Sequence, residues 1–401
     1  MSHSFIARQP IYDRELKVHG YELLFRSSET NRADIVDGED ATSQLLVNAL
    51  MEIGLAELVG SQPAFVNFTA SYLLQGLPAP MAREQVVLEI LEDVTPTEEL
   101  LAALTKLKAE GYTLALDDFV YEEAKRPLVE LADMVKLDVM GLSRPELESH
   151  VAQLKHFDVA LLAEKVETQE EFEHCKTLGF DYYQGYFFCK PQIVKGARTP
   201  SNRMGILRLL SRLQDPQLEF GELGDLIAQD VSFSYRILRY INSAEFHRSR
   251  KIESIHHAAT MLGLQRIRTW ATILAMSKVD DKPYELILTA LVRARMAESL
   301  SKEAKVLDQH AFTVGLFSAL DALTDQTMDD LLKALPLSDE INQALQNHAG
   351  ELGSLLGLVL AYERGDWGTV DRGHLDPDVV SKAYFDSLRW TRELNRSLLS
   401  A

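Results

Sequence analysis

The sequence predicts an α/β domain followed by an all-α domain, and we expect the first to be a (β/α)8 barrel of the TIM type. In residues 1–195, short apolar runs alternate with stretches at helical spacing. In residues 203–401, apolar residues recur at helical spacing along nearly the whole segment. The segment between them is rich in proline, glycine and basic residues, so we place the domain boundary within 192–203. A length of 401 residues is consistent with two domains.

The first domain contains eight strand-like runs, which cover residues 5–12, 18–25, 64–68, 86–91, 112–117, 134–138, 159–164 and 180–187. Helical stretches fall between most of them, at about 41–59, 96–110, 123–132, 145–155 and 168–178. Strands that alternate with helices favour a parallel sheet. Eight strands in this length predict a small closed barrel whose first two runs pair as a hairpin, and an open doubly wound sheet is the alternative.

The second domain contains helical stretches at about 203–214, 220–229, 233–242, 254–277, 284–303, 309–323, 327–334, 338–347, 352–363 and 377–398. Their apolar faces predict one helical core.

Charge is distributed unevenly along the chain, whose net charge is −19. Residues 1–195 carry 17 Lys and Arg against 33 Asp and Glu, and such an acidic half repels a nucleic-acid backbone. No apolar run approaches the about 20 residues of a membrane span, and the first residues lack a signal-peptide core. We therefore expect neither a nucleic acid nor a membrane as partner. The two cysteines, Cys175 and Cys189, fit a reduced, cytoplasmic location.

Polar side chains gather toward the ends of the strand-like runs. Parallel barrel strands present their carboxyl ends on one face, so these groups would converge there. Packed carboxylates need cations or protons, and an all-oxygen set suits Mg²⁺ or Mn²⁺. Each residue alone also fits a helix N-cap or a solvated loop. The set comprises Glu22, Asn67, Glu89, Glu92, Asp117, Asp118, Lys136, Asp138, Glu164, Glu167 and Gln184.

Eight short motifs in this half resemble, in order, those of the EAL domain family of cyclic di-GMP phosphodiesterases. They are Gln9–Ile11, Glu22–Arg26, Val66–Phe68, Leu88–Glu92, Leu116–Phe119, Lys136–Asp138, Ala163–Thr168 and Gln184–Pro191. The resemblance covers roughly residues 3–192. It implies an EAL-type barrel that hydrolyses cyclic di-GMP to linear pGpG with two Mg²⁺ or Mn²⁺ ions. The water between the ions would be the nucleophile.

The resemblance also implies a role for each residue of the site. The metal ligands would be Glu22, Asn67, Glu89, Asp117 and Asp118, with Asp117 shared by both ions. Lys136 would orient the water, Glu164 would act near the second ion as a ligand or proton acceptor, and Glu92 would brace the loop after the aspartate pair. Contacts with the substrate would come from Gln9, Leu24, Arg26, Asp138, Glu167 and Gln184.

Three departures from the family pattern keep a second function open. The loop Phe119–Lys125 lacks the family's small residues, Lys165 stands where the family has glycine, and Ser27–Asp40 lacks the family's W-x-H-P continuation. The family's loop supports the second metal and couples to dimerisation, so a homodimer is one alternative for the assembly. The alternative function is a catalytically degenerate domain that senses cyclic di-GMP or serves as an interaction scaffold.

The helical half is similar to HDOD domains, relatives of the HD metal-dependent phosphohydrolases, at Asp230–Ala244 and Ile252–Ile267. Where HD enzymes have their His-Asp pair, this chain has Ser318 and Ala319, and Arg293–Arg295 stands where an upstream histidine would lie. These side chains do not build a dinuclear metal site. We therefore expect a non-catalytic regulatory module that binds an unidentified protein partner.

Two further features of the helical half, a pair of adjacent histidines and a group of basic residues, have simple interpretations. His256 and His257 are adjacent on a helical stretch, so they point in different directions and do not form a metal-binding pair. Seven basic residues fall between 236 and 268, either as a solvated face or as a docking patch for the acidic first domain or an anionic partner. They are Arg236, Arg239, Arg248, Arg250, Lys251, Arg266 and Arg268.

Overall fold

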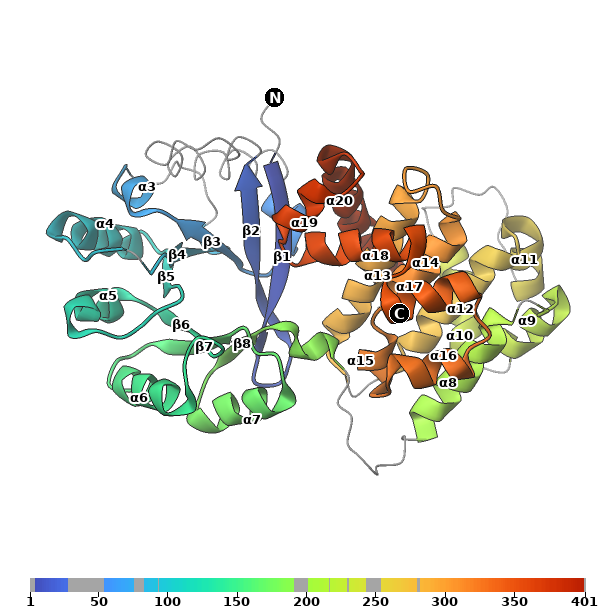
Figure 1. The fold of residues 1–401 in the computed structure, drawn as a ribbon, viewed down its shortest axis with the longest axis horizontal. Coiled ribbons are helices and arrows are strands. Elements are labelled where there is room, and N and C mark those ends of the chain that lie inside the picture. Colours follow the sequence, from blue (N-terminus) through green and yellow to red (C-terminus); the bar gives the residue numbers. More distant parts are fainter. Residues whose placement is uncertain are drawn as a thin grey trace. The chain divides into compact units, whose positions relative to one another are not determined.

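The computed structural model describes residues 4–27, 54–75, 83–92, 94–190, 201–215, 217–228, 231–242, 254–279 and 282–399 (Figure 1). The chain forms two compact units. The first consists of Met1–Phe187 together with Ala361–Ser381, and the second of Phe188–Leu360 together with Lys382–Ala401. Most of the predicted boundary region, 192–200, lies outside the described residues, and the domain limits 1–195 and 203–401 stay a prediction.

The first unit contains a closed barrel of eight strands in sequence order, as the alternating pattern predicts. Strand β1 pairs antiparallel with both β2 and β8, which confirms the expected hairpin, and the other neighbouring strands are parallel. The strands are β1 Ser4–Asp13, β2 Val18–Ser27, β3 Ala64–Phe68, β4 Val86–Ile90, β5 Thr113–Leu116, β6 Met134–Asp138, β7 Ala160–Glu164 and β8 Tyr182–Gln184.

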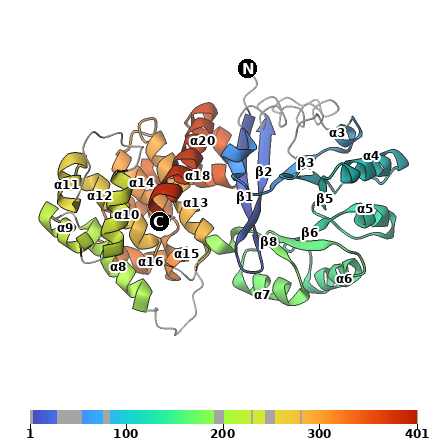
Figure 2. The ribbon, with the colours of Figure 1, turned by 180° about the vertical axis from the view of Figure 1, so that it is seen from behind.

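Helices α4 to α7 lie on the outside of the strands in both views of the ribbon (Figures 1 and 2). The short helix α3 follows β3 and was not expected from the sequence. Of the predicted helix at 41–59, residues 41–53 lie outside the described part. The helices are α2 Leu55–Val59, α3 Ala70–Gln75, α4 Glu98–Ala109, α5 Arg126–Leu131, α6 Arg144–Leu154 and α7 Gln169–Leu178.

Local sequence signals fix where these helices begin. Thr97 caps α4 by accepting the backbone N–H of Leu100, and Thr168 with Glu171 forms a capping box at the start of α7. The barrel interior is filled by one buried apolar cluster to which six strands contribute, and this packed layer supports the polar groups at the strand ends. Its members are Ile11, Phe65, Val87, Ala115, Met134 and Leu162.

The second unit is helical, as predicted. The expected helix at 254–277 is divided in two at Gly263, whose φ of 87° lies outside the helical region. Among the described helices, none has both the length and the apolar character needed to cross a bilayer. The helices from this part of the sequence are α8 Ser201–Gln214, α9 Phe220–Ala228, α10 Val231–Ile241, α11 Ile255–Leu262, α12 Leu264–Met276, α13 Tyr284–Leu300, α14 Asp308–Phe317, α15 Leu320–Thr324, α16 Met328–Ala334, α17 Asp339–Asn347, α18 Gly350–Glu363, α19 Trp367–Arg372 and α20 Pro377–Leu394.

Residues 361–381 pack with the barrel unit although they come from the C-terminal half of the sequence. The Tyr362 hydroxyl donates to the Ile6 carbonyl over 3.3 Å, and the ring centroids of Trp367 and Phe5 lie 6.2 Å apart. An added Cβ at Gly365 would approach the Leu24 side chain to 2.7 Å. The segment therefore lies against the β1–β2 hairpin.

Candidate metal centre

Three carboxylates from different strands converge in the barrel. Glu22 lies on β2, Glu89 lies on β4, and Asp117 directly follows β5. One ligand oxygen from each lies within 4.8 Å of the others, and the residues are only 7%, 0% and 9% exposed. Within the part of the chain that the structure describes, this is the one group of three or more His, Cys, Asp or Glu residues arranged to hold a metal ion.

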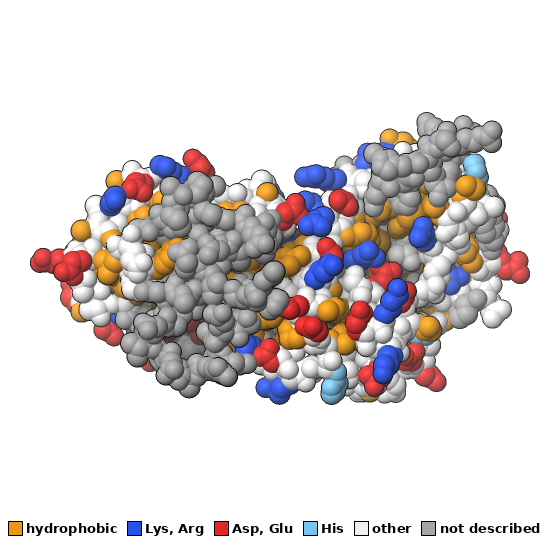
Figure 3. All heavy atoms as spheres, turned by 90° about the horizontal axis from the view of Figure 1, so that it is seen from above, with side chains coloured by type: hydrophobic (Ala, Val, Ile, Leu, Met, Phe, Trp, Pro, Cys, Tyr) orange, Lys and Arg blue, Asp and Glu red, His pale blue; other side chains and the backbone are white. Residues whose placement is uncertain are grey.

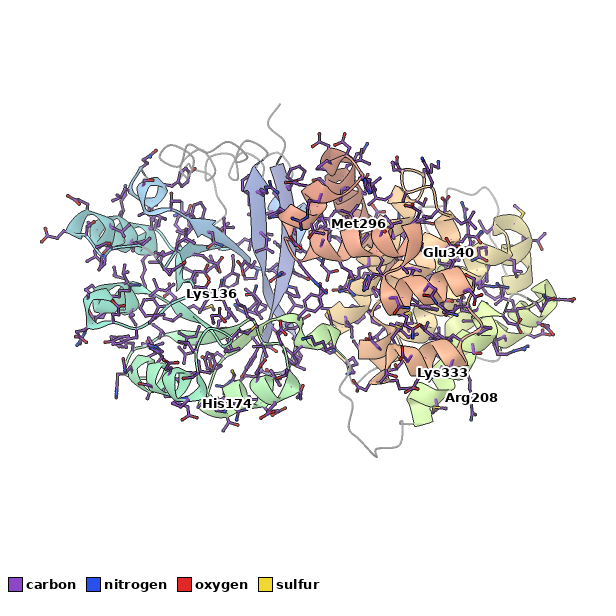
Figure 4. All side chains as sticks on the ribbon, in the orientation of Figure 1. Lys136, His174, Arg208, Met296, Lys333 and Glu340 are labelled. Atoms are coloured by element: carbon purple, nitrogen blue, oxygen red, sulfur yellow. The ribbon has the colours of Figure 1, made fainter. Side chains whose placement is uncertain are left out.

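A buried lysine lies among these acids. Lys136 on β6 is fully buried, and Figure 4 shows it amid the barrel strands. Its Nζ lies 2.5 Å from Glu89, 2.6 Å from Asp117 and 2.9 Å from Glu164, the last residue of β7. A fourth carboxylate, Glu22, is 3.4 Å away. One ammonium thus faces four carboxylates, so the cluster retains an excess of negative charge.

Side-chain amides hold part of this cluster in place. The Gln184 Nε2 at the end of β8 donates to Glu22 over 2.7 Å and to Gln9 over 3.1 Å. The Asn67 Nδ2 donates to the other Glu22 oxygen over 3.5 Å. The two amides therefore orient Glu22 from both sides.

Gly185 directly follows β8, and a Cβ at this position would clash with the Val166 carbonyl oxygen. The close approach of the β8 end to the loop after β7 therefore requires glycine.

Burial and crowding shift the titration of these groups. Desolvation raises the pKa of Glu89 well above its usual range, and Lys136 only partly offsets this. Desolvation also raises the pKa of Asp117, and raises the pKa of Glu164 to about 8. Burial lowers the pKa of Lys136, but the surrounding carboxylates outweigh this effect and raise the pKa well above its ordinary value. Burial and crowding thus disfavour the ionised carboxylates, and a further cation beside them would favour ionisation.

The donor set fits a hard divalent cation. Asn67 Oδ1, Glu89 Oε2 and Glu164 Oε2 are buried oxygens without a hydrogen-bond partner. Buried polar atoms are normally satisfied, so unsatisfied carboxylate and amide oxygens at one place indicate a missing cation or water. All these donors are oxygens, which Mg²⁺, Mn²⁺ and Ca²⁺ prefer.

A second, more exposed group lies at the neighbouring strand ends. The Lys165 Nζ lies 3.1 and 3.2 Å from the two Asp118 oxygens and 2.7 Å from Asp138 Oδ2. Burial opposes the charged lysine, but these two aspartates raise the pKa of Lys165 above its usual range. Asp138 also accepts the backbone N–H groups of Met140 and Gly141. Asp118, expected as a metal ligand, is thus paired with a lysine.

Three other predicted residues lie outside the carboxylate cluster. Glu92 is exposed, and its backbone carbonyl, rather than its side chain, accepts a hydrogen bond from Lys125 in the loop after Asp118. Glu167 is half-buried, and its backbone N–H joins the capping box of α7. Arg26 forms an ion pair of 2.6 Å with Asp371. The roles given to these residues remain predictions.

The altered loop after Asp118 is anchored by the barrel unit. The Phe119 N–H donates to the Lys136 carbonyl over 2.9 Å, and the Phe119 ring is buried. Lys125 reaches the Glu92 carbonyl, and the rings of Tyr121 and Phe157 are 6.0 Å apart. These contacts were not predictable from the local sequence, because their partners are distant along the chain.

The helical unit buries a cation of its own. Arg293 is 2% exposed and donates to the Ser318 hydroxyl over 3.2 Å and to the Cys189 sulfur over 3.8 Å. Burial raises the pKa of nearby Asp321, while the Arg293 charge lowers it. The absence of a dinuclear metal site in this unit stays a prediction.

The structure describes only some of the other residues that the sequence analysis singled out in the helical half. The side chain of His256 and the residues Arg248, Arg250 and Lys251 lie outside the described part. On the face seen in Figure 3, Lys and Arg side chains stand among Asp and Glu side chains. The solvated face and the docking patch both stay predictions.

The fold and the site together define an α/β-barrel protein with an acidic, cation-accepting centre at its strand ends. Residues 53–191 match the EAL domain family, and residues 200–351 match the HDOD domain family. The chain therefore belongs to the EAL domain family, with an HDOD domain after the barrel.

Relatives extend over nearly the whole chain. The YuxH protein of Bacillus subtilis is 34% identical over 97% of this chain and 98% of its own length. A Vibrio cholerae protein named cyclic di-GMP phosphodiesterase CdgJ is 34% identical over 98% of this chain and 93% of its own. The solved structure of the Bacillus subtilis YkuI protein, with an EAL domain, substrate c-di-GMP and calcium, is 18% identical, with a TM-score of 0.39 over 65% of this chain and 72% of that one.

Proposed function

We propose that the barrel unit is a metal-dependent phosphodiesterase that hydrolyses cyclic di-GMP to linear pGpG. The observation that carries this proposal is the convergence of Glu22, Glu89 and Asp117 beside buried oxygens that lack partners. Membership of the EAL domain family and the identity to the Vibrio cholerae phosphodiesterase support the choice of substrate.

The first metal ion, Mg²⁺ or Mn²⁺, would be held by Glu22, Asn67, Glu89 and Asp117. When bound, such an ion polarises a phosphoryl oxygen and lowers the pKa of a coordinated water. Gln184 and Asn67 orient Glu22 before the ion arrives, which reduces the reorganisation that binding requires. Lys136 keeps Glu89 and Asp117 close together despite their mutual repulsion.

Glu164 is proposed to act beside the ions, as a ligand or as a proton acceptor. Burial raises its pKa to about 8 before an ion binds, and the positive charge of a bound ion would favour the ionised form that can accept a proton. Its carboxylate lies 2.9 Å from Lys136, which holds it beside the other acids.

Substrate phosphate would be bound at the rim by Arg26, because a guanidinium fork matches phosphate oxygens. In the structure, the same guanidinium pairs with Asp371, so binding requires exchange of one anion for another. Gln9 is oriented by Gln184 and can contact a guanine. Leu24, Asp138 and Glu167 complete the predicted substrate contacts, and Glu92 would support the neighbouring loop.

The HDOD domain is proposed to be a regulatory module that binds an unidentified protein and performs no hydrolysis. This follows from Arg293 and Ser318, which stand in place of metal ligands. Dimerisation and a cytoplasmic location stay predictions.

The alternative function is a cyclic di-GMP sensor without turnover. The ion pair between Lys165 and Asp118 favours it, since a ligand expected for a second ion is engaged elsewhere. In that case the centre would bind the nucleotide and release it unchanged.

One experiment separates these functions. The purified full chain is incubated with cyclic di-GMP and Mg²⁺ or Mn²⁺, the products are resolved by chromatography, and binding is measured in parallel by calorimetry. We expect pGpG to accumulate, and chelator to stop its formation while the circular dichroism spectrum is unchanged. Binding without product would establish the sensor, and neither binding nor product would leave an interaction scaffold.

A further inference from the structure

We propose that the Lys165 ammonium replaces a second divalent cation, so that this chain binds a single metal ion in its acidic centre. The inference rests on the proposed function for the first ion only. Lys165 then supplies a permanent positive charge between Asp118 and Asp138.

Lys165 lies at the end of three neighbouring strands. Lys165 directly follows β7, which pairs with β6 through Asp138 and Glu164, and β6 pairs with β5, which precedes Asp118. The lysine therefore projects from the same end of the barrel as the predicted ligands, immediately after Glu164.

The Lys165 ammonium uses its whole donor capacity on carboxylate oxygens. A lysine ammonium has three N–H donors and no acceptor. The Lys165 Nζ has three close oxygens, both of Asp118 and one of Asp138, at 3.1, 3.2 and 2.7 Å. Its donors are thus directed to the carboxylates that would otherwise face a cation. An ion on the Asp118 oxygens would have to displace Lys165 or be repelled by it.

The backbone of both Lys165 and Asp118 adopts an unusual conformation. Lys165 has a φ of 56° and Asp118 a φ of 40°, both in the left-handed region. Side chains beyond Cβ are uncommon there, and glycine adopts this conformation freely. Lys165 adopts this glycine-like conformation, and its ammonium contacts two aspartates. Both observations indicate that the ammonium contributes to the site.

The competing interpretation is a displaceable surface ion pair. The Lys165 side chain is 48% exposed, and exposed pairs contribute little. In that case a second ion would readily displace Lys165 from Asp118. The two interpretations therefore predict different numbers of bound ions, one if Lys165 replaces the second ion and two if it is displaced.

The test counts Mn²⁺ ions on the full-length protein without nucleotide, by equilibrium dialysis and by the electron paramagnetic resonance signal of the bound ion. The variants are Lys165→Gly, which also relieves the backbone, and Lys165→Met, which keeps the length of the side chain. The control is Lys108→Met, because Lys108 makes a comparable ion pair of 3.0 Å with Asp133.

We expect one Mn²⁺ in the wild type and in Lys108→Met, and two in both Lys165 variants, with the signal altered by coupling between ions that share Asp117. Adding Asp118→Asn to Lys165→Gly should return the count to one. Two ions in the wild type, or a single ion in both Lys165 variants, would overturn the proposal. No ion in any variant would remove both this proposal and the metal centre, whereas one ion without hydrolysis would remove only the enzymatic function.

Discussion

The two units bury a cation in opposite electrostatic settings. In the barrel, Lys136 faces the carboxylates of Glu22, Glu89, Asp117 and Glu164. In the helical unit, Arg293 donates to a hydroxyl and a sulfur, and its charge lowers the pKa of Asp321. Carboxylates outnumber the ammonium around Lys136, whereas Arg293 contacts a hydroxyl and a thiol sulfur. We therefore expect an added divalent cation to bind in the barrel and not beside Arg293.

We expect buried charge alone to be a poor indicator of a metal site. The deciding quantity is the balance between ligand oxygens and the positive charge and hydrogen-bond donors around them. Beside Lys136, several buried oxygens lack a hydrogen-bond partner, whereas Arg293 donates to the Ser318 hydroxyl.

Replacing Glu22 by alanine should give the largest effect, a complete loss of hydrolysis. Groups that only orient metal ligands contribute about 10–100-fold, and a direct ligand should exceed that range. Mn²⁺ affinity and pGpG formation would be measured together on the folded variant. The matched control is Glu99→Ala, an exposed acid on α4, which should behave as the wild type. A near wild-type rate in Glu22→Ala would exclude the centre as the site of reaction.

Replacing Lys136 by methionine should destabilise the ion-free protein by about 3–5 kcal/mol, because the buried carboxylates lose their counter-charge. Added Mn²⁺ should restore much of this stability, since the ion can supply positive charge to the same oxygens. Urea unfolding with and without Mn²⁺ measures both effects. Equal stability of the variant in both conditions would show that the centre does not accept a cation.

Replacing Arg293 by methionine should destabilise the protein by about 1–3 kcal/mol, without rescue by Mn²⁺. Asp321 then loses a nearby positive charge. Burial already raises its pKa in the folded state, so its ionisation opposes folding, and this penalty grows as pH rises above the unfolded value of about 4. The loss of stability should therefore be greater near neutral pH than at acidic pH. A loss that is independent of pH, or one reversed by Mn²⁺, would contradict the contrast.

The sequence predicted the barrel well because its strands carry apolar runs of the right length between clear helical patterns. It also placed Glu22, Asn67, Glu89, Asp117 and Lys136 at one face, since strand ends converge in a barrel. Glu22 was found by this reasoning although the EAL match begins only at residue 53. Long-range pairing was not predictable, because Lys165 finds Asp118 across 47 positions through the closure of the barrel.

The C-terminal segment illustrates the same limit. Helix α19 was not predicted, since its six residues carry no clear periodic pattern. Nothing in the local sequence assigns Trp367 or Asp371 to the barrel unit. Their association with Phe5 and Arg26 is determined by tertiary packing alone.

The smallest expected effect comes from Asp371→Asn, at the rim where this segment meets the barrel strands. The Arg26 and Asp371 side chains are 19% and 33% exposed, and ion pairs of that kind contribute up to about 1 kcal/mol. Releasing Arg26 from a competing carboxylate should therefore lower the KM for cyclic di-GMP by at most about fivefold, with kcat unchanged. Asp371→Glu, which keeps the charge, is the matched control and should retain the wild-type KM. An increased KM in Asp371→Asn would mean that Asp371 positions Arg26 for the phosphate rather than competing with it, and the C-terminal segment would then be part of the binding site.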